Sequence, residues 1–290
     1  MSGKTVLLGS NGYLGKFLYR ALKACNVPII TSSRQGIEGC SRFDHFSIDF
    51  GAKNNFDELF YALREGRGGH ILHNLVFPKK EEILTEERWK LAVDDNIEFC
   101  NRYLREGQGI LINYISIKAK HPVNNDNYEF YHRYRAEQLE RVVKLNSVLV
   151  NMWVPNIYGL IDGEPDLGYK YLINQWFVSA VRNGEVSVLS PHDRRLTSLH
   201  LSDFWSNICF ISKFNSAGML NKSDWVGQAQ ISLSEILYAI RIAIRNLELP
   251  EPTFKGPHVN RWYAEPTIVS RHVSEMAVRF YNDYPHLKRF

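Results

Sequence analysis

Residues 5–15 read TVLLGSNGYLG, and this stretch decides the fold of the chain. An apolar run, Thr5–Leu8, leads into glycines at Gly9, Gly12 and Gly15 and then into a stretch with helical periodicity. The first glycine permits backbone angles that a side chain forbids. The second lets a pyrophosphate approach the backbone, and the third lets the helix pack closely on the strand. Because the helix begins with unbonded N–H groups, its N-terminus attracts phosphates. We predict a dinucleotide-binding loop, to which the alternative is a glycine-rich turn without a ligand.

Short apolar runs alternate with helix-like stretches from this loop to about residue 154. Strands and helices in this rhythm form a parallel sheet, and apolar residues on both faces of Ile71–Val76 are typical of a strand covered by helices. We predict an α/β fold: a Rossmann-type doubly wound parallel sheet over residues 1–160, and a smaller C-terminal substrate-binding or cap region over 161–290, partly interleaved with the core. Strands are predicted over residues 5–8, 27–31, 45–50, 70–76, 110–117 and 147–154, and helices over 13–24, 56–64, 89–104, 128–145, 171–181 and 234–245.

The composition is that of a globular protein. Hydrophobic residues make up 44% and charged residues 23% of the 290 residues, and the net charge is only +4. These values argue against extended disorder and against nucleic-acid binding. Cys25, Cys40, Cys100 and Cys209 are far apart and form no CxxC pair, so we expect no metal site and no disulfide framework. The N-terminal apolar run is too short for a signal peptide or a membrane span, and we therefore expect a cytoplasmic protein that does not bind membranes.

The end of the second predicted strand bears on the choice of cofactor. An NAD-selective site usually has an acidic residue here that binds both ribose hydroxyls, but the chain has Ser33 and Arg34 and no acid before Glu38. Ser33 and Arg34 suit the 2′-phosphate of NADP, because a guanidinium pairs well with phosphate. The alternative is a solvated loop arginine. Asp49, at the end of the third predicted strand, is placed either to accept the adenine amino group or to cap the next helix. We predict NADP(H) in preference to NAD(H).

Several motifs follow one another in an order typical of one protein family. Besides Gly9–Gly15 and Asp49, they are the fourth predicted strand ending in His73-Asn74-Leu75, the helical Asn96, the block Asn156-Ile157-Tyr158-Gly159, and the block Leu199–Asp203. With these motifs, residues 5–210 resemble the extended short-chain dehydrogenase/reductase family, which includes NAD(P)-dependent sugar-nucleotide epimerases, dehydratases and reductases.

The resemblance implies a set of cofactor-binding residues. It also implies that Asn96 supports the sheet and the active site, although a purely structural role is an equal alternative. The implied cofactor-binding residues are Gly9, Ser10, Asn11, Gly12, Tyr13, Leu14, Gly15, Ser33, Arg34, Asp49, Phe50, His73, Asn74, Leu75 and Arg135.

The implied catalytic residues depart from the family's pattern. The family uses Tyr-x-x-x-Lys, in which the lysine lowers the tyrosine pKa and binds the nicotinamide ribose, and a Ser or Thr that orients the substrate oxygen. Here Tyr131 and Arg135 fall at the tyrosine and lysine positions, one turn apart on the same helix face. Arginine keeps the charge but not the shape of lysine. Ile117 falls at the Ser/Thr position, and Ser116 beside it faces the other side of the strand unless a bulge turns it.

The implied catalytic set is therefore Tyr131, Arg135 and Ser116. Tyr128 with His132 has the same spacing and is a second candidate pair. The alternative for these rings is a packing role.

The substrate-binding residues implied by the resemblance lie later in the chain. They are Asn156, Arg194 and Arg195. The two arginines are included because the diphosphate of a nucleotide sugar requires cations. For the two arginines the alternative is a solvated basic turn. Trp153 stands where relatives often carry an arginine, which suggests an altered pocket. His200, between a strand and a helix, more often has a structural than a catalytic role.

Two hypotheses of function follow. The first is an NAD(P)-dependent oxidoreductase or epimerase that acts on a nucleotide-activated sugar or a related carbonyl or hydroxyl substrate. The second is a catalytically degenerate dinucleotide-binding protein with a regulatory or scaffold role. We favour the first because the phosphate loop, Tyr131 and a cation at position 135 remain. Family members are often dimers through two helices, here 89–104 and 128–145, so we expect a homodimer.

Overall fold

The computed structural model describes residues 4–34, 44–52, 56–64, 70–76, 85–106, 109–119, 127–142, 148–161, 171–189, 195–216, 223–225 and 229–256. The chain forms two compact units. The first comprises residues 1–154 and 205–226, and the second comprises residues 155–204 and 227–290. A late segment of the chain thus returns to the first unit.

The first unit is built on a seven-stranded sheet in which all neighbouring strands are parallel. Its strand order is β10-β6-β5-β4-β1-β2-β3. The chain runs from β1 outward to β3 and then crosses back to β4 on the other side of β1, so the order reverses between β1 and β4. Open α/β sheets bind ligands beyond the carboxyl ends of the strands at such a point. The strands are β1 (Thr5–Leu8), β2 (Ile29–Ser33), β3 (His45–Ser47), β4 (His70–Asn74), β5 (Gly109–Ser116), β6 (Val148–Val154) and β10 (Ser223–Trp225).

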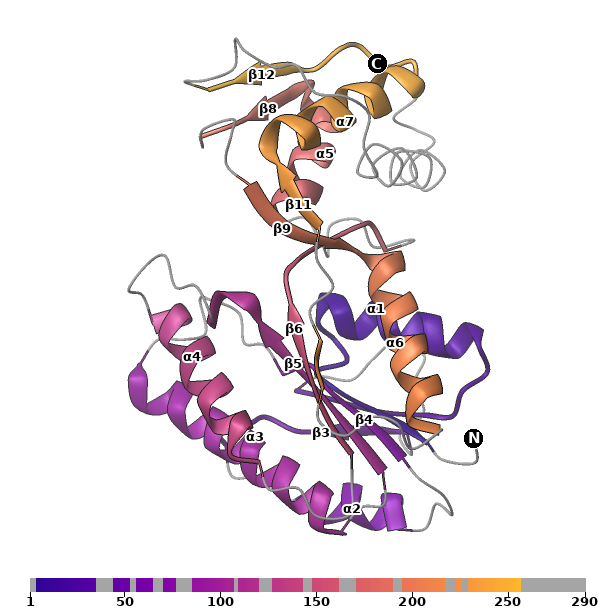
Figure 1. The fold of residues 1–290 in the computed structure, drawn as a ribbon, viewed down its shortest axis with the longest axis vertical. Coiled ribbons are helices and arrows are strands. Elements are labelled where there is room, and N and C mark those ends of the chain that lie inside the picture. Colours follow the sequence, from indigo (N-terminus) through magenta and orange to yellow (C-terminus); the bar gives the residue numbers. More distant parts are fainter. Residues whose placement is uncertain are drawn as a thin grey trace. The chain divides into compact units, whose positions relative to one another are not determined.

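Helices cover both faces of this sheet (Figure 1). On one face, α2, α3 and α4 bury a hydrophobic core against alternate strand residues such as Leu72 and Leu111, and Phe99 of α3 belongs to the same cluster. On the other face lie α1 and α6, and α1 contacts β1 and β2. The predicted Rossmann-type α/β fold is confirmed. These helices are α1 (Tyr13–Ala24), α2 (Asp57–Arg64), α3 (Glu86–Glu106), α4 (Asn127–Glu140) and α6 (Leu201–Ser216), and a 3₁₀ turn, η2 (Ile117–Ala119), follows β5.

The second unit has its own hydrophobic core, in which α5 packs on α7 through fully buried residues such as Phe177 and Ile240. A capping box begins α7: Ser232 Oγ accepts the N–H of Glu235, and the Glu235 carboxylate accepts the N–H of Ser232. The helices are α5 (Leu172–Asn183) and α7 (Leu233–Asn246). Strands β7 (Asn156–Tyr158), β9 (Arg195–His200) and β11 (Ala229–Ser232) form one sheet, and β8 (Glu185–Ser187) and β12 (Thr253–Lys255) form another.

The structure corrects the ends of several predicted elements. The sequence predicts a third strand that continues to Phe50, but β3 ends at Ser47. The reason is an aromatic cluster, in which the ring of Phe50 lies 5.9 Å from that of Phe56 and 6.1 Å from that of Phe99, between ring centroids. The helix predicted over 128–145 ends at Glu140. By contrast, β1 and α1 have the predicted bounds.

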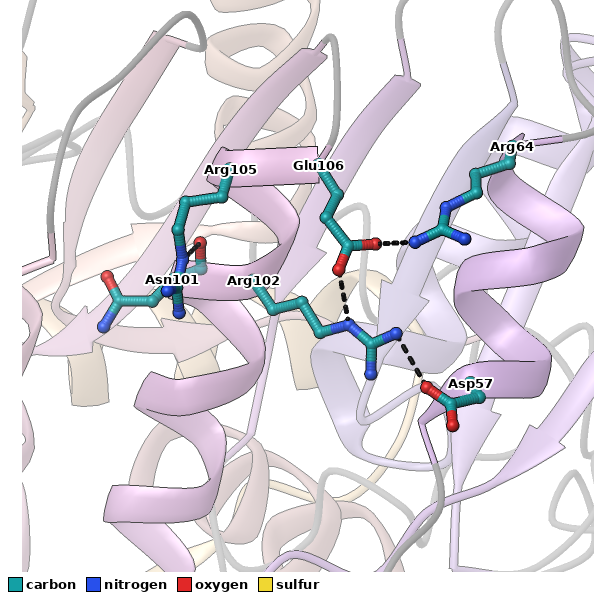
Figure 2. Close-up of polar contacts among 6 residues, drawn as sticks. All are labelled: Asp57, Arg64, Asn101, Arg102, Arg105 and Glu106. Carbon is teal, nitrogen blue, oxygen red and sulfur yellow. Dashed lines mark hydrogen bonds and ion pairs between the residues drawn. The ribbon is translucent and has the colours of Figure 1, made fainter.

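An ion-pair network on the surface joins α2 to α3 (Figure 2). Arg102 of α3 bonds to Asp57 of α2 at 2.7 Å and to Glu106 at 2.9 Å, and Arg64 of α2 bonds to Glu106. The Arg102 guanidinium also lies 4.2 Å from the centroid of the Phe60 ring. Burial alone would raise the pKa of Glu106, but the hydrogen bonds and charges of Arg64 and Arg102 outweigh it and hold that pKa below its ordinary value.

We expect Glu106→Gln to lower the free energy of unfolding at neutral pH by about 0.5–1 kcal/mol, the value of a partly exposed ion pair. Because the folded pKa of Glu106 is lowered, its stabilisation is complete above the unfolded pKa of about 4.3 and is lost as the pH falls through the folded pKa. Urea unfolding of the variant and the wild type should differ at about pH 7 and converge near about pH 3.

Glu98→Gln is the matched control, because Glu98 is an exposed glutamate of the same helix. An equal loss of stability in both variants would contradict the role given to the network.

Candidate functional site

The loop between β1 and α1 is held by contacts that only glycine permits. Gly9 has a φ of +80°, a region that favours glycine, and a Cβ there would lie 2.6 Å from the carbonyl oxygen of Leu75. A Cβ on Gly15 would lie 2.3 Å from the carbonyl oxygen of Gly9, so the helix packs directly on the loop. The N–H groups of Gly9 and Ser10 and the Ser10 hydroxyl all donate to the carbonyl oxygen of Ser32, which fixes the loop to β2.

The N-terminus of α1 has the features of a phosphate-binding helix end. Its N-cap, Gly12, is exposed; among the described residues no side chain caps it, and the first turn contains no acidic residue. A Cβ on Gly12 would meet one described atom within 4 Å, the Gly9 carbonyl oxygen at 3.3 Å. A helix N-terminus without an acidic residue in its first turn carries a partial positive charge that favours a phosphate. The side chains of Tyr13 and Leu14 are buried and that of Asn11 is half-buried, so the main chain is the part of this segment that a ligand meets.

Arg34 and Asp49 follow the neighbouring strands β2 and β3, and their side chains approach each other. Arg34 Nε lies 4.0 Å from Asp49 Oδ1, and the two side chains are 49% and 50% exposed. Ser47 Oγ donates to the carbonyl oxygen of Arg34 at 3.3 Å. Ser33 is buried opposite Ser47 in the strand register. The structure thus brings together the two charged residues that we predicted at the adenosine end of the site.

The turn after β3 is fastened to α3 by a residue that the sequence analysis did not single out. The N–H of Gly51, which has a φ of +89°, donates to Asp95 Oδ2 at 2.8 Å. The ring of Phe50, predicted as a cofactor contact, packs against the core beneath this turn. Asp95 stands directly before Asn96 in a run of acidic and polar residues, and only the tertiary structure shows which of them faces the turn.

At the carboxyl end of β4, His73 contributes a buried polar side chain. Its Nδ1 is hydrogen-bonded to the Tyr114 hydroxyl at 2.7 Å, with the rings stacked 6.0 Å apart between centroids. Burial lowers the pKa of His73 to about 3, so its ring is neutral at physiological pH. Leu75 contributes its main chain to this end of the strand. Its N–H donates to the carbonyl oxygen of Leu8, and its own carbonyl oxygen lies against Gly9.

Asn74 belongs to a buried network of amides that crosses the sheet. Asn74, Asn113 and Asn151 lie opposite one another on β4, β5 and β6. Asn74 Nδ2 donates to Asn113 Oδ1 at 3.1 Å, and Asn113 Nδ2 donates to Asn151 Oδ1 at 3.2 Å. Asn96 of α3 both donates to and accepts from Asn74, at 3.1 and 2.9 Å. A buried network of this kind positions α3 on the sheet, which gives Asn96 a structural role.

Tyr131 and Arg135 lie on the inner face of α4, and they are 2% and 1% exposed. The Arg135 guanidinium donates to the main-chain carbonyl oxygens of Tyr114 on β5 and, at 3.4 Å, of Asn74 on β4. The Tyr131 hydroxyl donates to the carbonyl oxygen of Val76 at 3.2 Å. Burial raises the pKa of Tyr131 to about 12, although the charge of Arg135 acts to lower it. The phenol is therefore neutral at physiological pH.

Strand β5 keeps a regular register to its last residue, Ser116, which lies opposite Val154. Ser116 Oγ accepts the N–H of Lys118 at 3.3 Å, and η2 begins at Ile117. No bulge therefore turns Ser116 within the described register of β5 with β6.

The side chains of the second candidate pair, Tyr128 and His132, are in contact. Their rings are edge-to-face with centroids 4.5 Å apart, and Lys118 Nζ lies 5.5 Å from the Tyr128 centroid.

The predicted substrate-binding residues belong to the second unit where they are described. Asn156 is exposed and donates through Nδ2 to the carbonyl oxygen of Thr197 at 3.2 Å, and Arg195 is exposed at the start of β9. Arg194 lies outside the described residues. His200 is buried, and its Nδ1 accepts the N–H of Ser202 at 3.2 Å. A hydrogen bond in the first turn of α6 agrees with the structural role predicted for His200.

Two further classes of site are not found in the described part of the chain. No group of three or more His, Cys, Asp or Glu side chains there is placed to hold a metal ion. No helix there is both long enough and apolar enough to cross a membrane.

The fold is shared with enzymes of nucleotide-sugar metabolism, although the sequence matches no family model and no curated protein. The structure superposes on MoeE5 in complex with UDP-glucose and NAD, with a TM-score of 0.69 at 11% identity over 97% of this chain and 99% of that one. UDP-N-acetylglucosamine 4-epimerase from Bacillus cereus gives 0.66 at 13% identity over 100% of both chains. TunA, an NAD-dependent NDP-hexosamine 5,6-dehydratase, gives 0.66 at 13% identity over 97% and 98%. At these identities the likeness establishes a common fold, and it is the fold that the sequence resemblance implied.

We expect Gly15→Ala to destabilise the protein by about 2 kcal/mol or more, because its Cβ would overlap main-chain atoms that have no room to move. Gly12→Ala should cost less than about 1 kcal/mol, since its φ of −73° suits alanine and its Cβ meets a single atom. Thermal unfolding of both variants tests this. Equal losses at the two positions would contradict the packing of α1 on the loop described above.

Proposed function

We propose that this protein binds a nicotinamide dinucleotide through its first unit and is an oxidoreductase or epimerase that acts on a nucleotide-activated sugar. The observation that carries the proposal is the N-terminus of α1 with its exposed N-cap, Gly12, behind the glycine loop, at the point where the strand order reverses. The exposed Gly12 leaves space for a pyrophosphate against the N–H groups. Other proteins of this fold lend support: MoeE5 is known in complex with NAD and either UDP-glucose or UDP-glucuronic acid.

The residues around the site fit the parts of such a cofactor. The N–H groups of α1 would hold the pyrophosphate, Arg34 and Asp49 would flank the adenosine, and the ends of β4 and β5 would lie near the nicotinamide. When bound, the nicotinamide accepts or donates the hydride. Tyr131 would exchange the proton with the substrate oxygen, after its hydroxyl releases the Val76 carbonyl. Arg135 would favour this exchange because its charge acts to lower the Tyr131 pKa.

The proposal extends to the type of cofactor, the substrate-binding residues, the oligomeric state and the location. We propose NADP(H) in preference to NAD(H), because Arg34 is half exposed at the end of β2 and no acidic residue precedes it there. Asn156, Arg194 and Arg195 remain the proposed substrate-binding residues. The exposed sides of α3 and α4, which carry Leu91 and Phe130, support a homodimer through these helices. A cytoplasmic location remains the expectation from the sequence.

The cofactor site is tested by calorimetric titration of NADPH and NADH. We expect wild-type protein to bind, Gly12→Ala to bind at least tenfold more weakly with little change in thermal stability, and Arg34→Ala to lose NADPH affinity about tenfold while it keeps NADH affinity within about twofold. Absence of binding by folded wild-type protein would remove the basis of the proposal and leave only the fold.

A second candidate function is favoured by the geometry at α4. The Tyr131 hydroxyl bonds to Val76, the Arg135 guanidinium bonds to two carbonyl oxygens of the sheet, and Ile117 cannot orient a substrate oxygen. These contacts suit a protein that binds a dinucleotide without hydride transfer, as a regulator or scaffold.

Turnover separates the two candidates. With NAD(P)(H) and a panel of UDP- and dTDP-sugars and their keto derivatives, an enzyme should show activity that Tyr131→Phe lowers at least about 100-fold. Tyr134→Phe is the matched control, because Tyr134 lies on the same helix and its hydroxyl donates to Asp94 at the surface. Tight cofactor binding without turnover on the panel would favour the regulatory candidate.

A further inference from the structure

The Arg34–Asp49 pair has a consequence for cofactor selectivity, which rests on the proposed function. Parallel strands β2 and β3 end side by side, and two hydrogen bonds fix these ends to each other. The N–H of Ile48 donates to the carbonyl oxygen of Ser33 at 3.2 Å, and Ser47 Oγ donates to the carbonyl oxygen of Arg34 at 3.3 Å. The main-chain positions of Arg34 and Asp49 are therefore fixed relative to each other by the sheet.

The turn that carries Asp49 is held in place from its other side as well. Gly51 donates its N–H to the Asp95 carboxylate on α3, and the ring of Phe50 packs against the core. The main chain of Asp49 therefore stays close to that of Arg34 in every conformation of the arginine side chain. By contrast, the arginine side chain is long, half exposed, and 4.0 Å from the carboxylate, a separation at which the ion pair is weak and easily opened.

A phosphate on the ribose would meet both charges. It carries between one and two negative charges near pH 7, so Arg34 attracts it and the carboxylate of Asp49, which the turn keeps nearby, repels it. Asp49 also competes with the phosphate for Arg34. A ribose that carries a free hydroxyl does not experience this repulsion, because a hydroxyl donates a hydrogen bond to a carboxylate.

We propose that Asp49 is a specificity-determining residue that limits the preference for NADP(H) by pairing with Arg34. With the carboxylate present, the two charges oppose each other, and NAD(H) and NADP(H) bind within about tenfold of each other. Removal of the Asp49 charge alone shifts the protein toward NADP(H).

The test is calorimetric titration of NADPH and NADH against wild type and Asp49→Asn. Asparagine keeps the size of the side chain and an oxygen that accepts from the adenine amino group. We expect NADPH to bind about tenfold more tightly to Asp49→Asn and NADH to change by less than about threefold. Glu58→Gln, which removes an exposed carboxylate on α2, is the matched control and should change neither affinity.

A second comparison tests the pairing itself. The gain in NADPH affinity from Asp49→Asn should be smaller when Arg34 is already alanine, because part of the effect of Asp49 acts through the arginine. An equal gain in both backgrounds overturns the role of the pair, and an unchanged NADPH-to-NADH ratio in Asp49→Asn overturns the inference while leaving the cofactor site intact. If folded wild-type protein binds neither cofactor, the proposed function itself fails. Retained NADH binding shows that Asp49→Asn is folded.

Discussion

The packing of Gly15 against the carbonyl oxygen of Gly9 is the constraint on which the rest of the candidate site depends. A Cβ at position 15 would lie 2.3 Å from that oxygen, and a Cβ at Gly9 would lie 2.6 Å from the carbonyl oxygen of Leu75. These contacts hold the first turn of α1 over the carboxyl ends of β1 and β4, where the strand order reverses. The helix N-terminus therefore points at the crevice that a parallel sheet offers to a ligand. Because the contacts are steric, only residues without a side chain satisfy them.

A different constraint governs the opposite end of the site, where Arg135 is buried beside the ends of β4 and β5. A buried charge is unfavourable unless hydrogen bonds compensate for the lost hydration. The planar guanidinium donates to carbonyl oxygens of two neighbouring strands, whereas the ammonium group of a lysine is a compact point charge without this fork. Arginine at this position thus braces α4 on the sheet while its charge still acts on Tyr131. These two hydrogen bonds give the arginine at this position a structural role.

The sequence allowed the fold and the phosphate loop to be predicted because both depend on local patterns. Glycine spacing and the alternation of apolar runs are visible along the chain, and β1 and α1 have the predicted bounds. The contacts of Asp95, Tyr114, Asn113 and Val76 were not predicted, because each joins residues that lie 38 to 55 positions apart in the sequence. Phe50 illustrates the same limit: its place in a strand was plausible from its neighbours, and tertiary packing with Phe99 removes it.

The burial of Tyr131 also affects the chemistry that its hydroxyl can perform. At a pKa of about 12, only about one Tyr131 phenol in 10⁵ is ionised near pH 7, which makes it a weak base. The same value leaves the neutral phenol fully populated, so Tyr131 is suited to donate a proton to a carbonyl oxygen as hydride arrives at the carbon. Its hydrogen bond to Val76 does not prevent this, because exchanging one neutral hydrogen bond for another costs only about 1 kcal/mol. Burial and the charge of Arg135 thus act on the pKa of Tyr131 in opposite directions, and burial is the stronger of the two.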